Sequence, residues 1–434
     1  MQRNAIARLV EWKNKIGRKP LVMWGARQVG KTWLAKEFGR QSFQNTVYIN
    51  FDIDRSVREL FDQDLYPQSL IKGLEGMYNA QIDPAKTLII FDEVQECNRA
   101  LVLLKYFQEI APEYHIVAAG SFLGVATHQG NSFPVGKVDM ITIYPMSFDE
   151  FLVGIGEEKM SDILNELNLS LIAGVSGRFA SLLKTYFYVG GMPEAVETYA
   201  QTKDFNAVRE VQNRILTSYR ADFSKHIAST DIPKARMIWE TIPLILGREN
   251  KKFQYSQVKS GGSAREFETA LDWLVHSGLV YRVHKIKTPN LPLSSYQENE
   301  HFKLYMLDVG LLAAAAALDI KTLLAPNNDL FTHFKGALTE QFVCQELKAT
   351  DKNYPLFYWK NDKGMAEVDF VIQYEDQAIP IEVKAGENVQ SKSLSVYRKS
   401  YQPLRSIRTS LKNYGDFNGV QSIPLYLIGK HFTR

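Results

Sequence analysis

The sequence predicts an α/β chain of three parts: a parallel-sheet domain in residues 1–150, a helical and winged-helix region in residues 151–325, and an α+β unit in residues 330–434. Three observations predict this order. Short apolar runs alternate with helical patterns up to residue 150, a mostly helical pattern continues to about residue 247, and strand-like runs return after Pro326. Strands spaced by helices indicate a parallel sheet with helices on both faces.

The composition indicates an ordinary globular protein with more than one domain. The chain has 434 residues, of which 45% are hydrophobic and 23% are charged, and it is too long for one ordinary core. It contains no apolar run long enough to span a membrane, and its N-terminus lacks the apolar stretch of a signal peptide. The two cysteines, Cys97 and Cys344, form no metal-ligand motif. We therefore expect a cytoplasmic chain without a membrane segment.

Charge is distributed unevenly along the chain. The net charge is +3, but the segment from Lys384 to the C-terminus carries nine Lys or Arg residues and only two Asp or Glu residues. A basic end on a mildly acidic body favours contact with a polyanion, although a solvated basic surface explains the same pattern. We expect nucleic acid, or else a protein partner, to bind the C-terminal unit.

The first domain is predicted to contain five strands, with the sequences LVMW, TVYINF, TLIIFDE, HIVAAGS and VDMITIYP. Between the first strand and a helical pattern lies GARQVGKT, from Gly25 to Thr32, which fits G-x-x-x-x-G-K-[ST] without exception. The glycines allow backbone N–H groups to turn toward phosphates, and the helix N-terminus adds the positive end of its dipole. Lys31 would neutralise the β- and γ-phosphates, and the Thr32 hydroxyl would bind Mg²⁺.

The strand TLIIFDE supplies the acidic partners of this loop. It would deliver Asp92 to the Mg²⁺ ion, and Glu93 beside it would polarise the attacking water as the catalytic residue. The next strand ends at Ser121, which we interpret either as a sensor of the γ-phosphate or as a simple turn serine. The predicted cofactors are ATP and Mg²⁺, and Thr32 and Asp92 would hold the metal. The predicted ATP-binding residues are Gly25, Ala26, Arg27, Gln28, Val29, Gly30, Lys31, Thr32, Asp92 and Ser121.

The middle region contains a predicted helix-turn-helix with a wing. In residues 251–287 a short helix, a Gly-Gly-Ser turn, a longer helix and an apolar strand follow one another. The longer helix would present Arg265 to DNA, but Glu266 and Glu268 flank it and would repel phosphates. Contact with DNA and packing on the first domain as a lid therefore have similar weight.

The C-terminal unit contains a predicted hairpin, EVDFVIQ followed by QAIPIEVK. If Tyr374 faces Gln377, the register places Asp369 opposite Glu382. Strand alternation then separates an apolar face from a charged face. The apolar face would hold Val368, Phe370, Ile372, Ile379, Ile381 and Val383, and the charged face Glu367, Asp369, Glu382 and Lys384.

Two interpretations of the charged face remain open. Asp369 and Glu382 could hold a Mg²⁺ ion, and Lys384 could orient a water or stabilise charge on a phosphate under attack. A hairpin with one solvated charged face gives the same pattern, and periodicity alone favours that interpretation. The offset of E-x-K from Asp369 and the basic segment that follows both favour a site.

This D…E-x-K arrangement resembles the restriction-endonuclease-like nuclease core. That core commonly adds a glutamate from the preceding helix, and the resemblance implies this role for Glu340 in KGALTEQF. It further implies catalytic roles for Asp369, Glu382 and Lys384, with Asp369 and Glu382 as metal ligands.

A second resemblance covers nearly the whole chain, from about residue 5 to residue 390. The segments GARQVGKT, IIFDEVQ, AAGS, YPMSFDEFL and YVGGMPEAV are similar to those of AAA-type ATPases of bacteria and archaea that carry a C-terminal domain of unknown function. The resemblance implies ATP binding by the loop and by Asp92, and catalysis by Glu93. It also implies that GGMP, from Gly190 to Pro193, covers the nucleotide. Gly136-Lys137 stands where relatives often have Gly-Arg, so the arginine finger stays unassigned among Arg27, Arg214 and Arg220.

These observations lead to two functional hypotheses. The first is an ATP-hydrolysing protein that couples its nucleotide state to a nuclease-like, DNA-interacting C-terminal site. The second is a regulatory ATPase, of toxin–antitoxin or defence type, whose C-terminal domain is a catalytically inert binding scaffold. Binding of a divalent metal at the C-terminal hairpin distinguishes the two.

Overall fold

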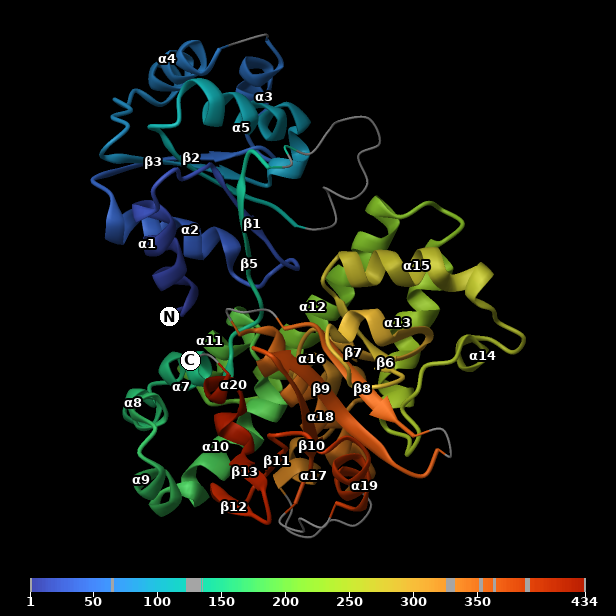
Figure 1. Cartoon of the computed structure of the whole chain (residues 1–434). Helices are drawn as coiled ribbons and strands as arrows, with labels where there is room; N and C mark the ends of the chain where they lie inside the picture. Colours follow the sequence, from blue (N-terminus) through green and yellow to red (C-terminus); the bar gives the residue numbers. More distant parts are fainter. Residues whose placement is uncertain are drawn as a thin grey trace.

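The computed structural model describes residues 2–63, 66–121, 134, 136–324, 332–350, 354–361, 364–386 and 391–432. Figure 1 shows a domain formed by the N-terminal part of the chain beside a larger body formed by the remainder. Among the residues described, no helix is long and apolar enough to cross a membrane.

The N-terminal sheet contains five parallel strands in the order β2-β3-β4-β1-β5. They are β1 (Leu21–Trp24), β2 (Asn45–Asn50), β3 (Thr87–Asp92), β4 (His115–Ala119) and β5 (Asp139–Thr142). All five coincide with predicted runs, and their parallel pairing confirms the α/β prediction for this part of the chain. The loop that follows β1 and the carboxylate at the end of β3 lie at the same edge, because parallel strands share their C-terminal edge.

Helices cover both faces of this sheet. Phe38 packs with Ile90 on one face, whereas Phe61 packs with Phe91, the next residue of β3, on the other. The helices of the domain are α1 (Ala5–Asn14), α2 (Lys31–Ser42), α3 (Arg55–Asp62), α4 (Pro67–Tyr78), the short η1 (Val94–Glu96) and α5 (Asn98–Ile110). The first two belong to the cluster that contains Phe38, and α3, α4 and α5 to the cluster that contains Phe61.

The middle of the chain is mostly helical, as predicted. Its helices are α7 (Phe148–Gly154), α8 (Glu158–Glu166), α9 (Leu169–Gly174), α10 (Ser176–Val189), α11 (Pro193–Thr202), α12 (Phe205–His226), α13 (Ile232–Leu246), α14 (Tyr255–Val258) and α15 (Ala264–His276). The short helix α14, the turn and the longer helix α15 lie where the helix-turn-helix was expected.

A second sheet of eight strands forms the centre of the larger body, in the order β12-β13-β11-β10-β9-β8-β6-β7. Its strands are β6 (Val280–Ile286), β7 (Gln297–Met306), β8 (Leu356–Lys360), β9 (Glu367–Tyr374), β10 (Gln377–Val383), β11 (Ile407–Ser410), β12 (Gly415–Phe417) and β13 (Val420–Pro424). Its connections contain η2 (Leu293–Tyr296), α16 (Val309–Ala315), α17 (Ile320–Leu324), α18 (Thr332–Lys348) and α19 (Lys392–Tyr401). After the last strand come η4 (Leu425–Leu427) and α20 (Ile428–His431).

This sheet crosses the predicted division between the middle and C-terminal parts. The hairpin of β6 and β7 occupies the position of the expected wing, but β6 also pairs in parallel with β8. The hairpin is therefore one end of the larger sheet, and β7 is its edge strand. A boundary near residues 325–330 stays a prediction, and it falls inside one continuous sheet.

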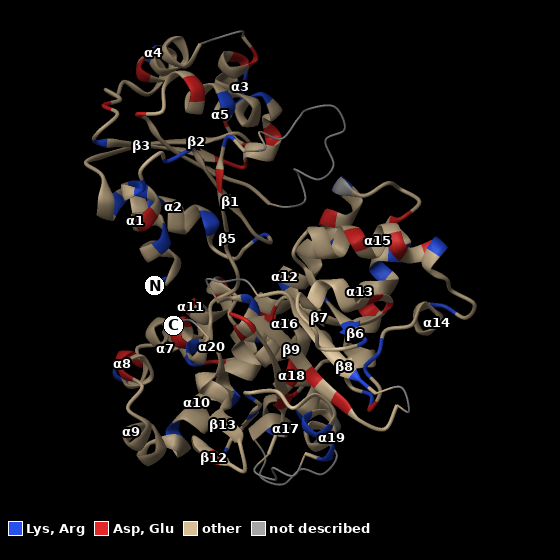
Figure 2. Ribbon diagram, in the orientation of Figure 1, with Lys and Arg blue, Asp and Glu red and all other residues tan. Residues whose placement is uncertain are grey.

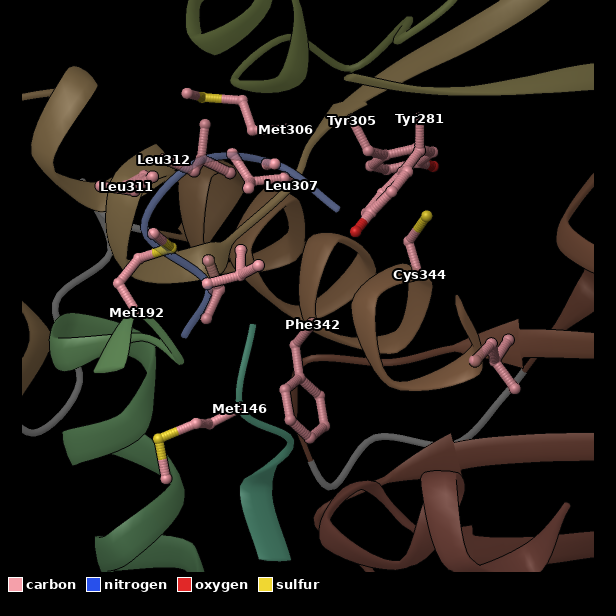
Figure 3. Close-up of a cluster of buried hydrophobic side chains, with 14 of the residues drawn as sticks. Met146, Met192, Tyr281, Tyr305, Met306, Leu307, Leu311, Leu312, Phe342 and Cys344 are labelled. Atoms are coloured by element: carbon pink, nitrogen blue, oxygen red, sulfur yellow. The ribbon is translucent and has the colours of Figure 1, made fainter. Parts of the chain in front are cut away.

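One apolar cluster joins the three parts of the chain. Figure 3 shows Met146, which follows the first sheet, and Met192, from the GGMP segment, near Leu311 of α16 and Phe342 of α18. Four of its members, Met146, Met192, Leu311 and Phe342, have no exposed surface. Burial of apolar side chains is the main source of stability in a protein core, so the three parts are expected to stabilise one another.

Candidate functional site

The loop from Gly25 to Thr32 connects β1 to α2, as predicted. Gly25 has a φ of 150° and Gly30 a φ of 92°, in the region that favours glycine. A Cβ on Gly25 would lie 2.3 Å from the carbonyl oxygen of Ile143, so the site also requires a residue without a side chain. The backbone conformation at both positions therefore favours glycine over any residue with a side chain.

The side chains at the end of this loop are held by hydrogen bonds. The Lys31 ammonium donates to the carbonyl oxygens of Gly25, at 2.9 Å, and of Ala26, at 2.8 Å. The Thr32 hydroxyl donates to Oδ2 of Asp92 at 2.8 Å. This contact brings together the two residues that were predicted to share a metal ion.

A further residue joins this pair. The Tyr48 hydroxyl, from β2, donates to the same Asp92 oxygen at 2.8 Å. Burial lowers the pKa of Lys31 to about 8, and the nearby Glu93 and Asp92 carboxylates only partly offset that effect. The loop therefore contains a partly buried cation whose charge is costly until an anion binds beside it.

The other two predicted residues lie beyond the neighbouring strand ends. Glu93 has a φ of 50° and accepts a hydrogen bond from the Gln95 side-chain amide. Such a left-handed conformation is uncommon for a glutamate and is found more often at functional sites. Ser121 is buried, and its hydroxyl has no hydrogen-bond partner within the described part of the chain.

A cavity of about 940 Å³ opens over the loop. It is large enough for a nucleotide by the usual size of ligand pockets. Its lining includes predicted residues from the loop and Glu93, together with Pro193 from the GGMP segment. The lining residues are Arg3, Arg27, Gln28, Gly30, Lys31, Thr32, Trp33, Asp52, Glu93, Glu96, Met146, Pro193, Glu194, Glu197, Ser218 and Lys225.

Three of the predicted loop residues line a different cavity. Gly25, Ala26 and Val29 face a smaller space of about 320 Å³ on the side of β6 and α18. Asp92 lies behind Thr32, and Ser121 is not part of either lining. Five of the predicted loop residues therefore lie at the large cavity together with Glu93, namely Arg27, Gln28, Gly30, Lys31 and Thr32.

The candidate arginines are all engaged in ion pairs. Arg27 pairs with Asp222 of α12, and Tyr219 donates to the Arg27 carbonyl oxygen at 2.8 Å. Arg214 pairs with Glu194 at 2.8 Å, and Arg220 lies 3.8 Å from Glu240. None of these contacts distinguishes an arginine finger. The pair of Arg27 and Asp222 connects the loop to α12 in the helical region.

Sequence reasoning missed Arg3 at this site. Arg3 precedes α1, is 5% exposed and lines the large cavity. It belongs to no motif in MQRNAIARL, so the sequence contained no signal for it.

The second candidate site lies on the predicted hairpin of β9 and β10. The strands pair antiparallel from Tyr374 opposite Gln377 to Phe370 opposite Ile381, which confirms the predicted register. The next position contains Asp369, whose Oδ2 accepts a hydrogen bond from the backbone N–H of Val383 at 2.8 Å.

The predicted alternation is wrong at one point. Between β8 and β9 the register shifts, because Phe357 pairs with Val371 but Trp359 pairs with Val368. β9 therefore contains one extra residue beside Asp369. As a result Val368 packs with Trp359 and Val371, and not with Phe370 in the main core as expected. Bulges of this kind re-aim side chains next to functional sites.

The charged residues form a partly buried cluster and not a fully solvated face. Glu340, from α18, is 8% exposed, and Glu382 is 3% exposed. Lys384 pairs with Glu382 at 2.8 Å. Burial, followed by the Glu340 and Glu382 carboxylates, holds the pKa of Asp369 well above its usual value. The structure thus brings together Glu340, Asp369, Glu382 and Lys384.

Two lysines that the sequence did not indicate complete this cluster. Lys251 pairs with Glu340, and Lys303, from β7, lies 2.6 Å from Glu367 and 3.8 Å from Glu340. Lys303 is only 1% exposed. Burial raises the pKa of Glu340, but the two lysines outweigh that effect and leave it below its usual value. In the described residues, no group of three or more His, Cys, Asp or Glu side chains is arranged to hold a metal ion.

The acidic residues of α15 are also engaged. Glu266 pairs with Lys259 at 3.0 Å and Glu268 with Arg282 at 2.8 Å, while Arg265 is exposed. In Figure 2, the charged positions of α15 are mostly acidic (red). Its acids are therefore paired with neighbouring basic side chains.

Comparisons with known proteins agree with part of this description. Residues 17–152 match the AAA domain family, residues 180–322 match a domain of unknown function (DUF8612), and residues 335–428 match another (DUF4143). The chain therefore contains an AAA-type P-loop ATPase domain, followed by regions whose families have no assigned function.

The curated relatives and solved structures are distant. Uncharacterized proteins of Mycobacterium bovis and Mycobacterium tuberculosis are each 24% identical over 88% of this chain and 74% of their own length. A Walker-type ATPase of Pyrococcus abyssi is similar over 72% of this chain and 95% of its own, with 14% identity and a TM-score of 0.44. Thermotoga maritima RuvB, a Holliday junction branch migration motor, is similar over 65% of this chain and 90% of its own, with 11% identity and a TM-score of 0.31.

Proposed function

We propose that the AAA-type domain binds and hydrolyses ATP, and that its nucleotide state controls the carboxylate cluster of the C-terminal unit. The observation that supports the first half is the contact between Thr32 and Asp92 at 2.8 Å, next to a lysine in a phosphate-binding loop. A hydroxyl and a carboxylate in contact are the oxygen ligands that Mg²⁺ prefers. No other arrangement in the described chain combines this geometry with a cavity of nucleotide size.

In this proposal the residues of the loop have separate roles. Lys31 exchanges its two carbonyl partners for phosphate oxygens, which stabilises its charge. Thr32 and Asp92 hold Mg²⁺, which would neutralise charge on the transferred phosphoryl group when bound. Glu93 turns from Gln95 toward the attacking water and orients it as a base.

The second half concerns the carboxylate cluster. Asp369 and Glu382 would hold a divalent metal, Glu340 would support it, and Lys384 would stabilise the phosphate under attack. The burial of Glu340 and Glu382 supports this assignment, since solvated charges on a hairpin face would be exposed. The basic segment after Lys384 would supply contacts to nucleic-acid phosphates.

A second candidate function is favoured by Lys251 and Lys303. These lysines pair with Glu340 and Glu367 and already compensate part of the negative charge of the cluster. A charge-balanced cluster has less affinity for a metal, so this observation favours a regulatory ATPase with an inert C-terminal scaffold. Titration of the protein with Mn²⁺ distinguishes the two functions.

ATP hydrolysis is tested with Lys31→Ala. The purified protein should release phosphate from ATP, and Lys31→Ala should reduce ATP affinity and turnover by roughly 100-fold or more, because it removes a buried charge–phosphate contact. Lys72→Ala, at an exposed position on α4, is the control and should behave as wild type. Unchanged ATP affinity in Lys31→Ala would disprove the first half of the proposal.

The cluster is tested by incubating plasmid and single-stranded DNA with Mg²⁺ or Mn²⁺, with and without ATP. We expect cleavage that is lost in Asp369→Asn and retained in Asp376→Asn, an exposed aspartate at the turn of the same hairpin. Intact DNA under every condition, with ATP still hydrolysed, would leave the inert-scaffold function.

A further inference from the structure

Arg3 makes three directed contacts beside the phosphate-binding loop and also lines the large cavity. Its Nη1 donates to the Val29 carbonyl oxygen at 2.9 Å, its Nη2 to the Tyr144 carbonyl oxygen at 2.8 Å, and its Nε to Oε1 of Glu150 at 3.1 Å. One guanidinium thus ties together the loop, the segment after β5 and the helix α7. Only arginine has five donors in a rigid planar fork that could make such a set.

The contact with Val29 determines the direction of a neighbouring N–H group. The peptide between Val29 and Gly30 is planar and trans, so its C=O and N–H point in opposite directions. When Arg3 holds the carbonyl oxygen, the Gly30 N–H is turned away from Arg3. Within the described residues that N–H has no hydrogen-bond acceptor, so it is free to bind a phosphate oxygen.

The position of Arg3 is itself fixed. Its partner Glu150 also accepts from the Asn4 backbone N–H at 2.6 Å and forms a capping box with Ser147 at the start of α7. A Cβ on Gly30 would lie 3.3 Å from Nη1 of Arg3 and 3.3 Å from Pro193 of the GGMP segment. Arg3 therefore packs directly against the loop and is held there from the other side.

We propose that Arg3 is a positioning residue for ATP hydrolysis, which orients the Gly30 N–H and the loop around it for the phosphates. This inference rests on the proposed ATPase function. It assigns to the N-terminal segment a role that the loop motif does not contain, because the motif supplies the N–H groups but not the contact that directs them. The charge of Arg3 at the cavity would add attraction for the nucleotide.

The test compares Arg3→Lys and Arg3→Ala with a matched control. Arg18 also donates to three backbone carbonyls, those of Pro112, Glu113 and Tyr114, but at the opposite edge of the same sheet. We expect kcat for ATP to fall roughly 10- to 100-fold in both Arg3 variants, because a displacement of the loop by about 1 Å moves the phosphates out of the reactive position. KM should change little in Arg3→Lys, which keeps the charge, and Arg18→Ala should retain wild-type kcat and KM.

Three further results decide the proposal. Recovery of kcat in Arg3→Ala on addition of guanidinium ion at a non-denaturing concentration would support the proposal. If Arg3 acted only on the stability of the fold, added guanidinium ion would not restore kcat. If Arg3→Ala fails to fold, the kcat of Arg3→Lys alone decides whether the proposal holds. Wild-type kcat in a folded Arg3→Lys variant, or an equal loss in Arg18→Ala, would overturn it.

Failure of the ATPase function would look different. If the wild-type protein binds ATP without hydrolysing it, the proposed hydrolysis fails, and Arg3 is tested through ATP affinity, which Arg3→Ala should reduce and Arg18→Ala should not. If the wild-type protein binds no ATP at all, both proposals fail together.

Discussion

Lys31 is a partly buried cation whose charge is stabilised by an anion that binds next to it. Within the described part of the chain its ammonium donates to two carbonyl oxygens, and burial lowers its pKa to about 8. Phosphate oxygens carry full negative charge and would raise this pKa again. Nucleotide binding and proton binding at Lys31 are therefore linked.

This linkage predicts how ATP affinity depends on pH. Above about pH 8 the nucleotide-free loop contains neutral Lys31, so ATP binding must take up a proton and its affinity should fall by up to about tenfold per pH unit. Calorimetry at alkaline pH in two buffers of different ionisation enthalpy measures the proton uptake. In Lys31→Arg the guanidinium stays charged, so the uptake should disappear. Equal proton uptake in the two proteins would assign the effect to another group.

Helix α18 connects the carboxylate cluster to the segment that supports Arg3. Glu340 belongs to the cluster, and six residues later Oε1 of Glu346 accepts a hydrogen bond from the Phe148 N–H of α7 at 2.8 Å. Burial raises the pKa of Glu346 to about 8, the nearby Asp149 and Glu150 carboxylates add to the effect, and Lys430 opposes it. Helix α18 thus contributes Glu340 to the carboxylate cluster and contacts α7, the helix whose Glu150 holds Arg3.

The raised pKa of Glu346 predicts a pH-dependent stability. The folded protein keeps this carboxyl protonated up to about pH 8, whereas the unfolded chain releases the proton near pH 4.5. Stability should therefore decrease as pH rises between these values, by up to about 1.4 kcal/mol per pH unit. Glu346→Gln keeps the acceptor oxygen and cannot ionise, so its melting temperature should exceed that of wild type at pH 8, and the difference should vanish as the pH falls to about 4. A constant difference across this range would contradict the assignment.

The elements were largely predictable from the sequence, and the reasons are local. Hydrophobic runs, glycine turns and the loop motif gave the five parallel strands, and Tyr374 opposite Gln377 followed from a two-residue turn. The bulge beside Asp369 was not predictable, because an extra residue in one strand leaves no mark in its alternation. Arg3, Lys251 and Lys303 were missed since their partners are distant in the sequence, and only the folded chain brings them together.

At the level of the whole molecule, the eight-stranded sheet determines which parts of the chain depend on one another. β6 and β7 come from the middle region and pair with each other, and β6 also pairs with β8 from the C-terminal region. The cluster that contains Met146, Met192 and Phe342 adds apolar contacts across the same division (Figure 3). These regions should therefore fold together, whatever families their sequences match.

This arrangement predicts the behaviour of a truncated chain. A fragment of residues 1–325 would expose the edge of β6 and the apolar surface that α18 covers. We expect it to bind a hydrophobic dye such as 8-anilinonaphthalene-1-sulfonate and to lose the cooperative melting transition of the middle region. The full chain is the control. A fragment with wild-type melting behaviour in this region would show that the predicted division is a true domain boundary.

The edge strand β7 has one more consequence, for association between copies of the chain. Its first half is exposed or half-exposed and carries the carboxylates of Glu298 and Glu300. Unpaired backbone groups on an open edge can add a strand from another molecule and start aggregation, and charged side chains on the edge oppose this. Replacing these charges with apolar residues would leave both candidate sites intact and would be expected to make the protein prone to precipitation.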